Sequence, residues 1–181
     1  AVQSFCDGGH VVVTGCWDGH VRLHRVETSD AKQSQVLRGH TDRVTNVTAH
    51  SHLPFTISSS MDGTFRVWDL RQGGACAQEV VAHTSTVQTA VFGPSGDVIA
   101  SGGDDKNIHV WDCRQTKSPL RSMSLNVGVN RLSFSPSGGL LLAPCDDGVS
   151  RAFDSRGRCV FVLESGWTTS KVAVARSLLS F

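Results

Sequence analysis

A sequence pattern that recurs about every 43 residues is the feature that most constrains the fold of this chain. The segment SSSMDGTFRVWDLR at residues 58–71 returns as SGGDDKNIHVWDCR at 101–114 and, without its tryptophan, as CDDGVSRAFDSR at 145–156. Four aligned aspartates stand 44, 43 and 42 residues apart, namely Asp18, Asp62, Asp105 and Asp147. A period of about 20–50 residues indicates an array of units, each burying its apolar surface against the next.

Within each copy the residues are typical of short strands joined by tight turns. Three of the four aspartates precede a glycine, which readily adopts the positive φ angles of hairpin turns. The segments before these turns, such as HVVVTG at 10–15, are nearly continuous in apolar residues, as expected for strands covered on both faces. Outer strands are predicted at 34–38, 77–81, 120–125 and 159–164. The sequence therefore predicts an all-β fold made of about four small sheets.

The composition argues against two classes of partner. Hydrophobic residues make up 39% and charged residues 18% of the 181 residues, and no apolar run has the length of a spanning helix. The net charge is +1 with scattered basic residues, so neither nucleic acid nor a membrane is expected as a partner. The six cysteines are widely spaced without a CxxC pair, which favours reduced thiols and a cytoplasmic or nuclear location.

Two pairs of dipeptides carry a resemblance to a known family. Gly39-His40 with Trp68-Asp69, and Ala82-His83 with Trp111-Asp112, make the chain similar to the WD-repeat family of β-propellers. The resemblance implies a partial propeller over 1–163, with blades at about 1–38, 39–81, 82–124 and 125–163. In the first copy the apolar residue that begins the innermost strand would fall just before Ala1, so the chain is expected to open inside a blade. Rings in this family are mostly seven-bladed, so three blades are expected to be missing. Residues 164–181 fit no blade and are left unassigned.

The same resemblance implies two buried hydrogen-bond networks. They would consist of His40, Ser58, Asp62 and Trp68 in one copy, and of His83, Ser101, Asp105 and Trp111 in the next. In the last copy Leu125, Ala143 and Phe153 stand at the positions of the histidine, serine and tryptophan. Buried polar groups that lose their partners cost about 1–3 kcal/mol each, so the tryptophan is expected to disappear together with its partners. Asp147 is then expected to face solvent.

Catalytic and metal-binding interpretations compete with structural ones. Ser58, His40 and Asp62 superficially form a hydrolase triad, but their recurrence in the next copy indicates architecture, so no catalytic residue and no cofactor is predicted. His50 and His52 form an HxH pair that could hold a metal, yet solvated loop histidines are favoured. Arg22, Arg66 and Arg151 recur at one strand position and could suggest an anion site. Their recurrence instead favours aliphatic side-chain stems that pack along the sheet with the charged groups at its rim.

A candidate partner-binding surface follows from the propeller topology. Residues just before the turn aspartates would lie on the upper face of the ring, which commonly docks peptides in this family. The candidates are Trp17, Met61, Asp104 and Asp146, with Arg43 close by. An aromatic ring beside a thioether, with acidic neighbours, suits a basic or amphipathic segment. The alternative is that Trp17 packs on its own loop.

The predicted function is a non-catalytic, regulatory scaffold for protein–protein interaction. The alternative is a substrate-recognition subunit of a larger complex such as a ubiquitin ligase. The fourth copy, with Ser118-Pro119-Leu120, Val129-Asn130-Arg131 and Arg151-Ala152-Phe153-Asp154, resembles one regulatory group of the family. That resemblance implies a phosphofurin acidic cluster sorting adaptor as a partner.

Overall fold

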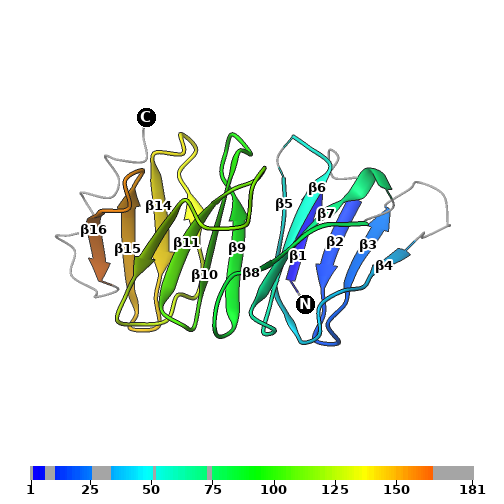
Figure 1. Cartoon of the computed structure of the whole chain (residues 1–181), viewed down its shortest axis with the longest axis horizontal. Helices are drawn as coiled ribbons and strands as arrows, with labels where there is room; N and C mark the ends of the chain where they lie inside the picture. Colours follow the sequence, from blue (N-terminus) through cyan, green and yellow to red (C-terminus); the bar gives the residue numbers. More distant parts are fainter. Residues whose placement is uncertain (1, 7–10, 26–33, 51, 73–74, 165–181) are drawn as a thin grey trace.

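The computed structural model contains four antiparallel sheets that stand side by side in chain order (Figure 1). It describes residues 2–6, 11–25, 34–50, 52–72 and 75–164. In each sheet four strands pair in chain order. The predicted all-β architecture of stacked sheets is confirmed. In the described part the only helical element is a 3-10 turn, η2 (Leu70–Gln72), and no helix there is long and apolar enough to span a membrane.

The sixteen strands divide evenly among the sheets. The first sheet contains β1 (Val2–Cys6), β2 (Val11–Gly15), β3 (Val21–Arg25) and β4 (Ser34–Leu37). The second contains β5 (Val44–Ala49), β6 (Phe55–Ser60), β7 (Thr64–Asp69) and β8 (Ala75–Val81). The third contains β9 (Val87–Phe92), β10 (Val98–Gly103), β11 (Asn107–Asp112) and β12 (Arg121–Ser124). The fourth contains β13 (Ser133–Phe134), β14 (Leu140–Pro144), β15 (Val149–Asp154) and β16 (Cys159–Glu164).

The register between the two inner strands is the same in all four sheets. One position of the repeat in the first strand always pairs with the same position of the repeat in the second strand. The pairs are Phe5 with Val12, Ala49 with Thr56, Phe92 with Ile99, and Phe134 with Leu141. The sequence period therefore corresponds to one sheet, repeated four times.

The turns that carry the aspartates need a left-handed backbone at one position. Glycine supplies it at Gly63, whose φ is 81°, and at the equivalent turns of the first and fourth sheets. The third sheet has Lys106 at this place, with φ of 69°. These turns, at 17–19, 61–63, 104–106 and 146–148, lie along one edge of the row of sheets, at the bottom of Figure 1. We call this edge the aspartate-turn edge.

Apolar side chains fill each of the three interfaces between successive sheets. Each sheet is too thin to enclose a core of its own, so burial requires stacking against a neighbour, and a fully buried Val, Leu or Phe contributes about 1.5–3 kcal/mol. The buried members include, interface by interface, Val13, Leu23, Val47 and Trp68; Ile57, Phe65, Val87 and Trp111; and Ile108, Met123, Leu132 and Phe153.

Candidate functional site

Four polar side chains of the second sheet form a buried chain of hydrogen bonds. His40 donates from Nδ1 to Asp62 Oδ2 at 2.9 Å, and its Nε2 meets Ser58 Oγ at 2.7 Å. The indole N–H of Trp68 donates to the same Ser58 oxygen at 2.8 Å. Asp62 also accepts from the hydroxyl and backbone N–H of Thr64. Every member therefore has a partner, which makes its burial tolerable.

The third sheet repeats this arrangement. His83 Nδ1 lies 2.8 Å from Asp105 Oδ1, and His83 Nε2 lies 2.9 Å from Ser101 Oγ. Trp111 donates its indole N–H to Ser101 Oγ at 3.0 Å. The structure thus brings together the four residues that the family resemblance implies in each of these two sheets.

The contacts of Ser58 decide between a catalytic and a structural role. Its distances to His40, and those of His40 to Asp62, match a nucleophile, base and orienting acid. However, Ser58 is fully buried and its oxygen already accepts the Trp68 indole N–H. A substrate carbonyl has no path to this oxygen, so the three residues hold the sheet together.

Arginines pair with the turn aspartates of the first and fourth sheets. Arg22 forms an ion pair with Asp18, and Arg151 pairs with Asp147 at 2.7 Å. The hydrogen bond from Arg22 lowers the pKa of Asp18 to about 2. Asp147 is exposed, as predicted. In the second sheet Arg66 instead pairs with Glu79 at 2.9 Å, so all three arginines have carboxylate partners and the anion-site interpretation loses its free cations.

The structure overturns the interpretation of His50 as a solvated loop residue. Only 5% of His50 is exposed, and its Nδ1 accepts the backbone N–H groups of His52 and Leu53 at 3.0 and 2.9 Å. Its ring contacts Phe92 with a centroid distance of 4.9 Å. His50 therefore fixes the turn between β5 and β6 from inside, whereas His52 is exposed as predicted.

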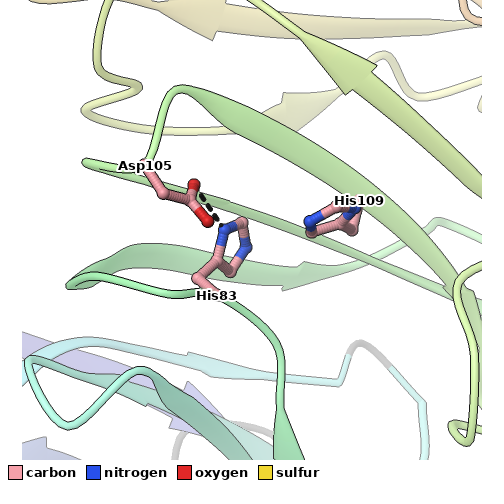
Figure 2. A group of neighbouring side chains, drawn as sticks. All are labelled: His83, Asp105 and His109. Carbon is pink, nitrogen blue, oxygen red and sulfur yellow. Dashed lines mark hydrogen bonds and ion pairs between the residues drawn. The ribbon is translucent and has the colours of Figure 1, made fainter.

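A second histidine in the third sheet extends its network. Figure 2 shows His109 beside His83 and Asp105, and the ligand atoms of the three residues lie within 4.8 Å of one another. His109 stands where the other sheets have arginine, and its Nδ1 meets Ser122 Oγ at 2.8 Å. Both ring nitrogens of His83 already serve Asp105 and Ser101. A metal ion could use His83 only by breaking the structural network, so the group is better explained as part of it.

The pKa shifts in these networks predict that stability falls as the pH falls. Burial lowers the pKa of His83 and of His109 below 6.5, so both stay neutral when folded while the unfolded chain takes up protons. Burial is the largest single influence on Asp105 and opposes its ionisation, but the interactions with His83 and the backbone N–H groups of Asn107 and Thr84 together outweigh it and hold the pKa of Asp105 below 3.8. The free energy of unfolding should therefore decrease from about pH 6.5 downward. Urea titrations at pH 7.5, 6.5 and 5.5 test this, and equal values at all three would contradict it.

An exposed aromatic ring dominates the aspartate-turn edge of the first sheet. Trp17 is 74% exposed, and the guanidinium carbon of Arg43 lies 4.9 Å from the centroid of its ring. Arg43 belongs to the loop that leads into the second sheet, so the ring contacts the neighbouring repeat rather than only its own loop. A cation over an indole face is attractive and holds the ring in place without covering its other face.

The remaining candidate residues occupy one equivalent place in each following sheet. The backbone N–H of Met61 donates to the Arg43 carbonyl at 2.9 Å. Asp104 and Asp146 make the same bond to the carbonyls of Thr86 and Gly128, at 3.0 and 3.1 Å. Met61 is 42% exposed, and both aspartates are exposed. The structure therefore presents all five candidates along one edge.

Comparison with known proteins agrees with this geometry. The family model described as "WD domain, G-beta repeat" matches residues 1–25, 31–69 and 74–112, and the chain belongs to this family. These matches end before the fourth sheet, in which the buried network has been replaced by apolar residues.

The chain is also similar to individual curated proteins. It is 36% identical over 151 residues to WD repeat-containing protein 37 of Xenopus tropicalis and 35% identical to that of Homo sapiens. Each alignment covers 83% of this chain and 30% of the relative. Pre-mRNA-processing factor 19 homolog 2 of Arabidopsis thaliana is 28% identical over 84% of this chain and 29% of its own length. The chain thus spans about 30% of the length of these relatives. The group that the fourth copy was predicted to resemble is that of WD repeat-containing protein 37, and this resemblance is confirmed.

Proposed function

We propose that this chain is part of a regulatory scaffold that binds protein partners and has no catalytic chemistry of its own. The observation that carries the proposal is the exposed Trp17 ring, held by Arg43 on the aspartate-turn edge. Tryptophan is frequent among the residues that dominate binding energy, so an exposed ring held in one position is a candidate anchor for a partner. The burial of Ser58 supports the absence of hydrolase chemistry.

The surface defines the chemistry of the partner. Trp17 and Met61 offer an apolar patch, and a polarizable thioether adapts to different side chains. Asp104 and Asp146 add negative charge farther along the edge. Asp146 lies against the backbone of Gly128, where a Cβ atom would stand 2.3 Å from its carboxylate oxygen and 3.8 Å from Asp104 Cα. A partner segment fits this edge if an apolar residue contacts the patch and a lysine or arginine that follows it reaches the two aspartates.

The phosphofurin acidic cluster sorting adaptors are the first partners to test, because of the resemblance to WD repeat-containing protein 37. A cytoplasmic or nuclear location accompanies this proposal. Burial raises the pKa of Cys113 to about 11 and also raises that of Cys145, as in structural thiols that stay protonated. The second candidate function, substrate recognition for a catalytic complex, would use the same edge and differs in the identity of the partners.

Replacing Trp17 with alanine should weaken capture of the partner by about tenfold or more, which corresponds to about 1.4 kcal/mol. The measurement is a quantitative pull-down, first with a recombinant sorting adaptor and then with cell extract analysed by mass spectrometry. Recovery of ligase subunits in place of the adaptor would favour the second candidate function.

The matched control is Leu53→Ala, which removes a half-exposed apolar side chain at the opposite edge of the second sheet. Both variants should keep their free energy of unfolding within about 0.5 kcal/mol, because neither side chain belongs to the core. Equal capture by wild type and Trp17→Ala would show that the partner surface lies elsewhere.

A further inference from the structure

A groove opens between the third and fourth sheets, away from the surface just described. Its volume is about 280 Å³. The third sheet contributes Val98, Val110 and Met123 to its walls, and the fourth contributes Phe134, Leu141 and Phe153. It lies at the starts of β10 and β14 and at the end of β15, so it opens at the edge opposite the aspartate turns.

The groove exists because the interface between the third and fourth sheets has smaller side chains than the interface between the second and third sheets. Between the second and third sheets, the indole of Trp111 belongs to a buried cluster against which Phe55, Phe92 and Cys113 pack. One repeat later the smaller Phe153 replaces the indole. Val98 takes the place of Phe55, because Val98 pairs with Asp112 as Phe55 pairs with Asp69. Close packing elsewhere in the molecule makes this shortfall a defined space rather than a general looseness.

The size and walls of the groove suit a bicyclic aromatic ring. An apolar cavity of roughly 150 Å³ holds a benzene molecule, and this groove has nearly twice that volume. Most of the side chains lining it are aliphatic or aromatic, as in sites that bind flat apolar rings. The repeat itself provides the precedent, since the equivalent place in the preceding interface contains an indole.

The charges at the mouth of the groove favour a ligand that has a negatively charged group next to its aromatic ring. Arg121 lines the groove, is exposed, and has no ion-pair partner among the residues that the structure describes. Asp154, the acidic residue of the groove, is already paired with Arg158 at 2.8 Å and accepts two backbone N–H groups. The unpaired charge is therefore positive.

We propose that this groove binds a tryptophan side chain of a partner protein, followed by an acidic residue that pairs with Arg121. A protein segment is favoured over a free aromatic acid because Leu120, 58% exposed, extends the apolar surface beyond the area that one ring covers. The groove is a second contact point, and it does not depend on the surface around Trp17.

The test uses the whole 181-residue chain and a blocked dipeptide, N-acetyl-(5-fluoro-Trp)-Asp amide, followed by fluorine NMR. The expected result is saturable binding that Val98→Phe weakens at least tenfold, because this change restores the phenyl ring of the preceding interface. Arg121→Gln should weaken binding roughly two- to fivefold, as expected for an exposed ion pair. The matched control Arg131→Gln, at another exposed arginine, should leave binding unchanged.

Two comparisons keep the outcome decisive. The Trp-Lys dipeptide should bind more weakly than Trp-Asp to the wild type and equally to Arg121→Gln. If Val98→Phe fails to fold, the double change Ala143→Ser and Phe153→Trp, which restores an indole with its acceptor, replaces it as the filled variant. Absence of binding to the wild type, or equal binding to a folded filled variant, would overturn the proposal. Trp17→Ala should not alter dipeptide binding, so this result is independent of the proposed function.

Discussion

Replacing Trp68 with alanine is expected to lower the free energy of unfolding by about 3–5 kcal/mol. Trp68 is 1% exposed and packs in the interface between the first and second sheets, among residues that include Val44 and Leu70. Its removal leaves a cavity between two sheets that are held together mainly by such contacts. It also takes one hydrogen-bond partner from Ser58, which is fully buried.

Urea denaturation at neutral pH measures this effect. Trp17→Ala is the matched control, because it removes the same side chain from an exposed position and should change the free energy of unfolding by less than about 0.5 kcal/mol. A loss below about 1 kcal/mol for Trp68→Ala would mean that the interface does not depend on this ring.

The second large effect is expected at Gly96, in the turn between β9 and β10. Its φ is 77°, and a Cβ atom would stand 2.0 Å from Nε2 of His50, a buried ring that cannot move without losing its contacts. Gly96→Ala should therefore cost about 3 kcal/mol, since it adds the displacement of His50 to the backbone strain of a side chain in the left-handed region.

Gly138 provides a control within the same protein. It takes the equivalent turn of the fourth sheet, with φ of 73°, but a Cβ atom there meets only Pro94 at 3.6 Å. Gly138→Ala should cost about 1 kcal/mol from backbone strain alone. Thermal or urea denaturation of the two variants isolates the contribution of His50, and equal losses would show that His50 is not fixed in its site.

The repeat allowed the architecture to be predicted from the sequence, because equivalent residues take equivalent places in every sheet. Phe5, Ala49, Phe92 and Phe134 were aligned by spacing, and each pairs with the corresponding residue of the next strand. The two networks followed from the family resemblance for the same reason. The fourth sheet could be predicted as well, since its aspartate turn and strand pattern remain after the tryptophan is lost.

Features that depend on a single long-range contact could not be predicted. His50 is buried because Phe92 and Gly96 come to lie against it, and no local pattern around His50 indicates this. The groove required a comparison of two complete interfaces, because it results from smaller side chains on both facing sheets.

The most direct test of the account is the effect of Trp68→Ala measured again in a Ser58→Ala background. The members of a network depend on one another, which explains why the fourth sheet has alanine at 143 and phenylalanine at 153 together. The loss caused by Trp68→Ala should then be smaller by about 0.5–3 kcal/mol when Ser58 is already absent. Equal losses in the two backgrounds, within about 0.3 kcal/mol, would show that these residues act independently and would contradict the account.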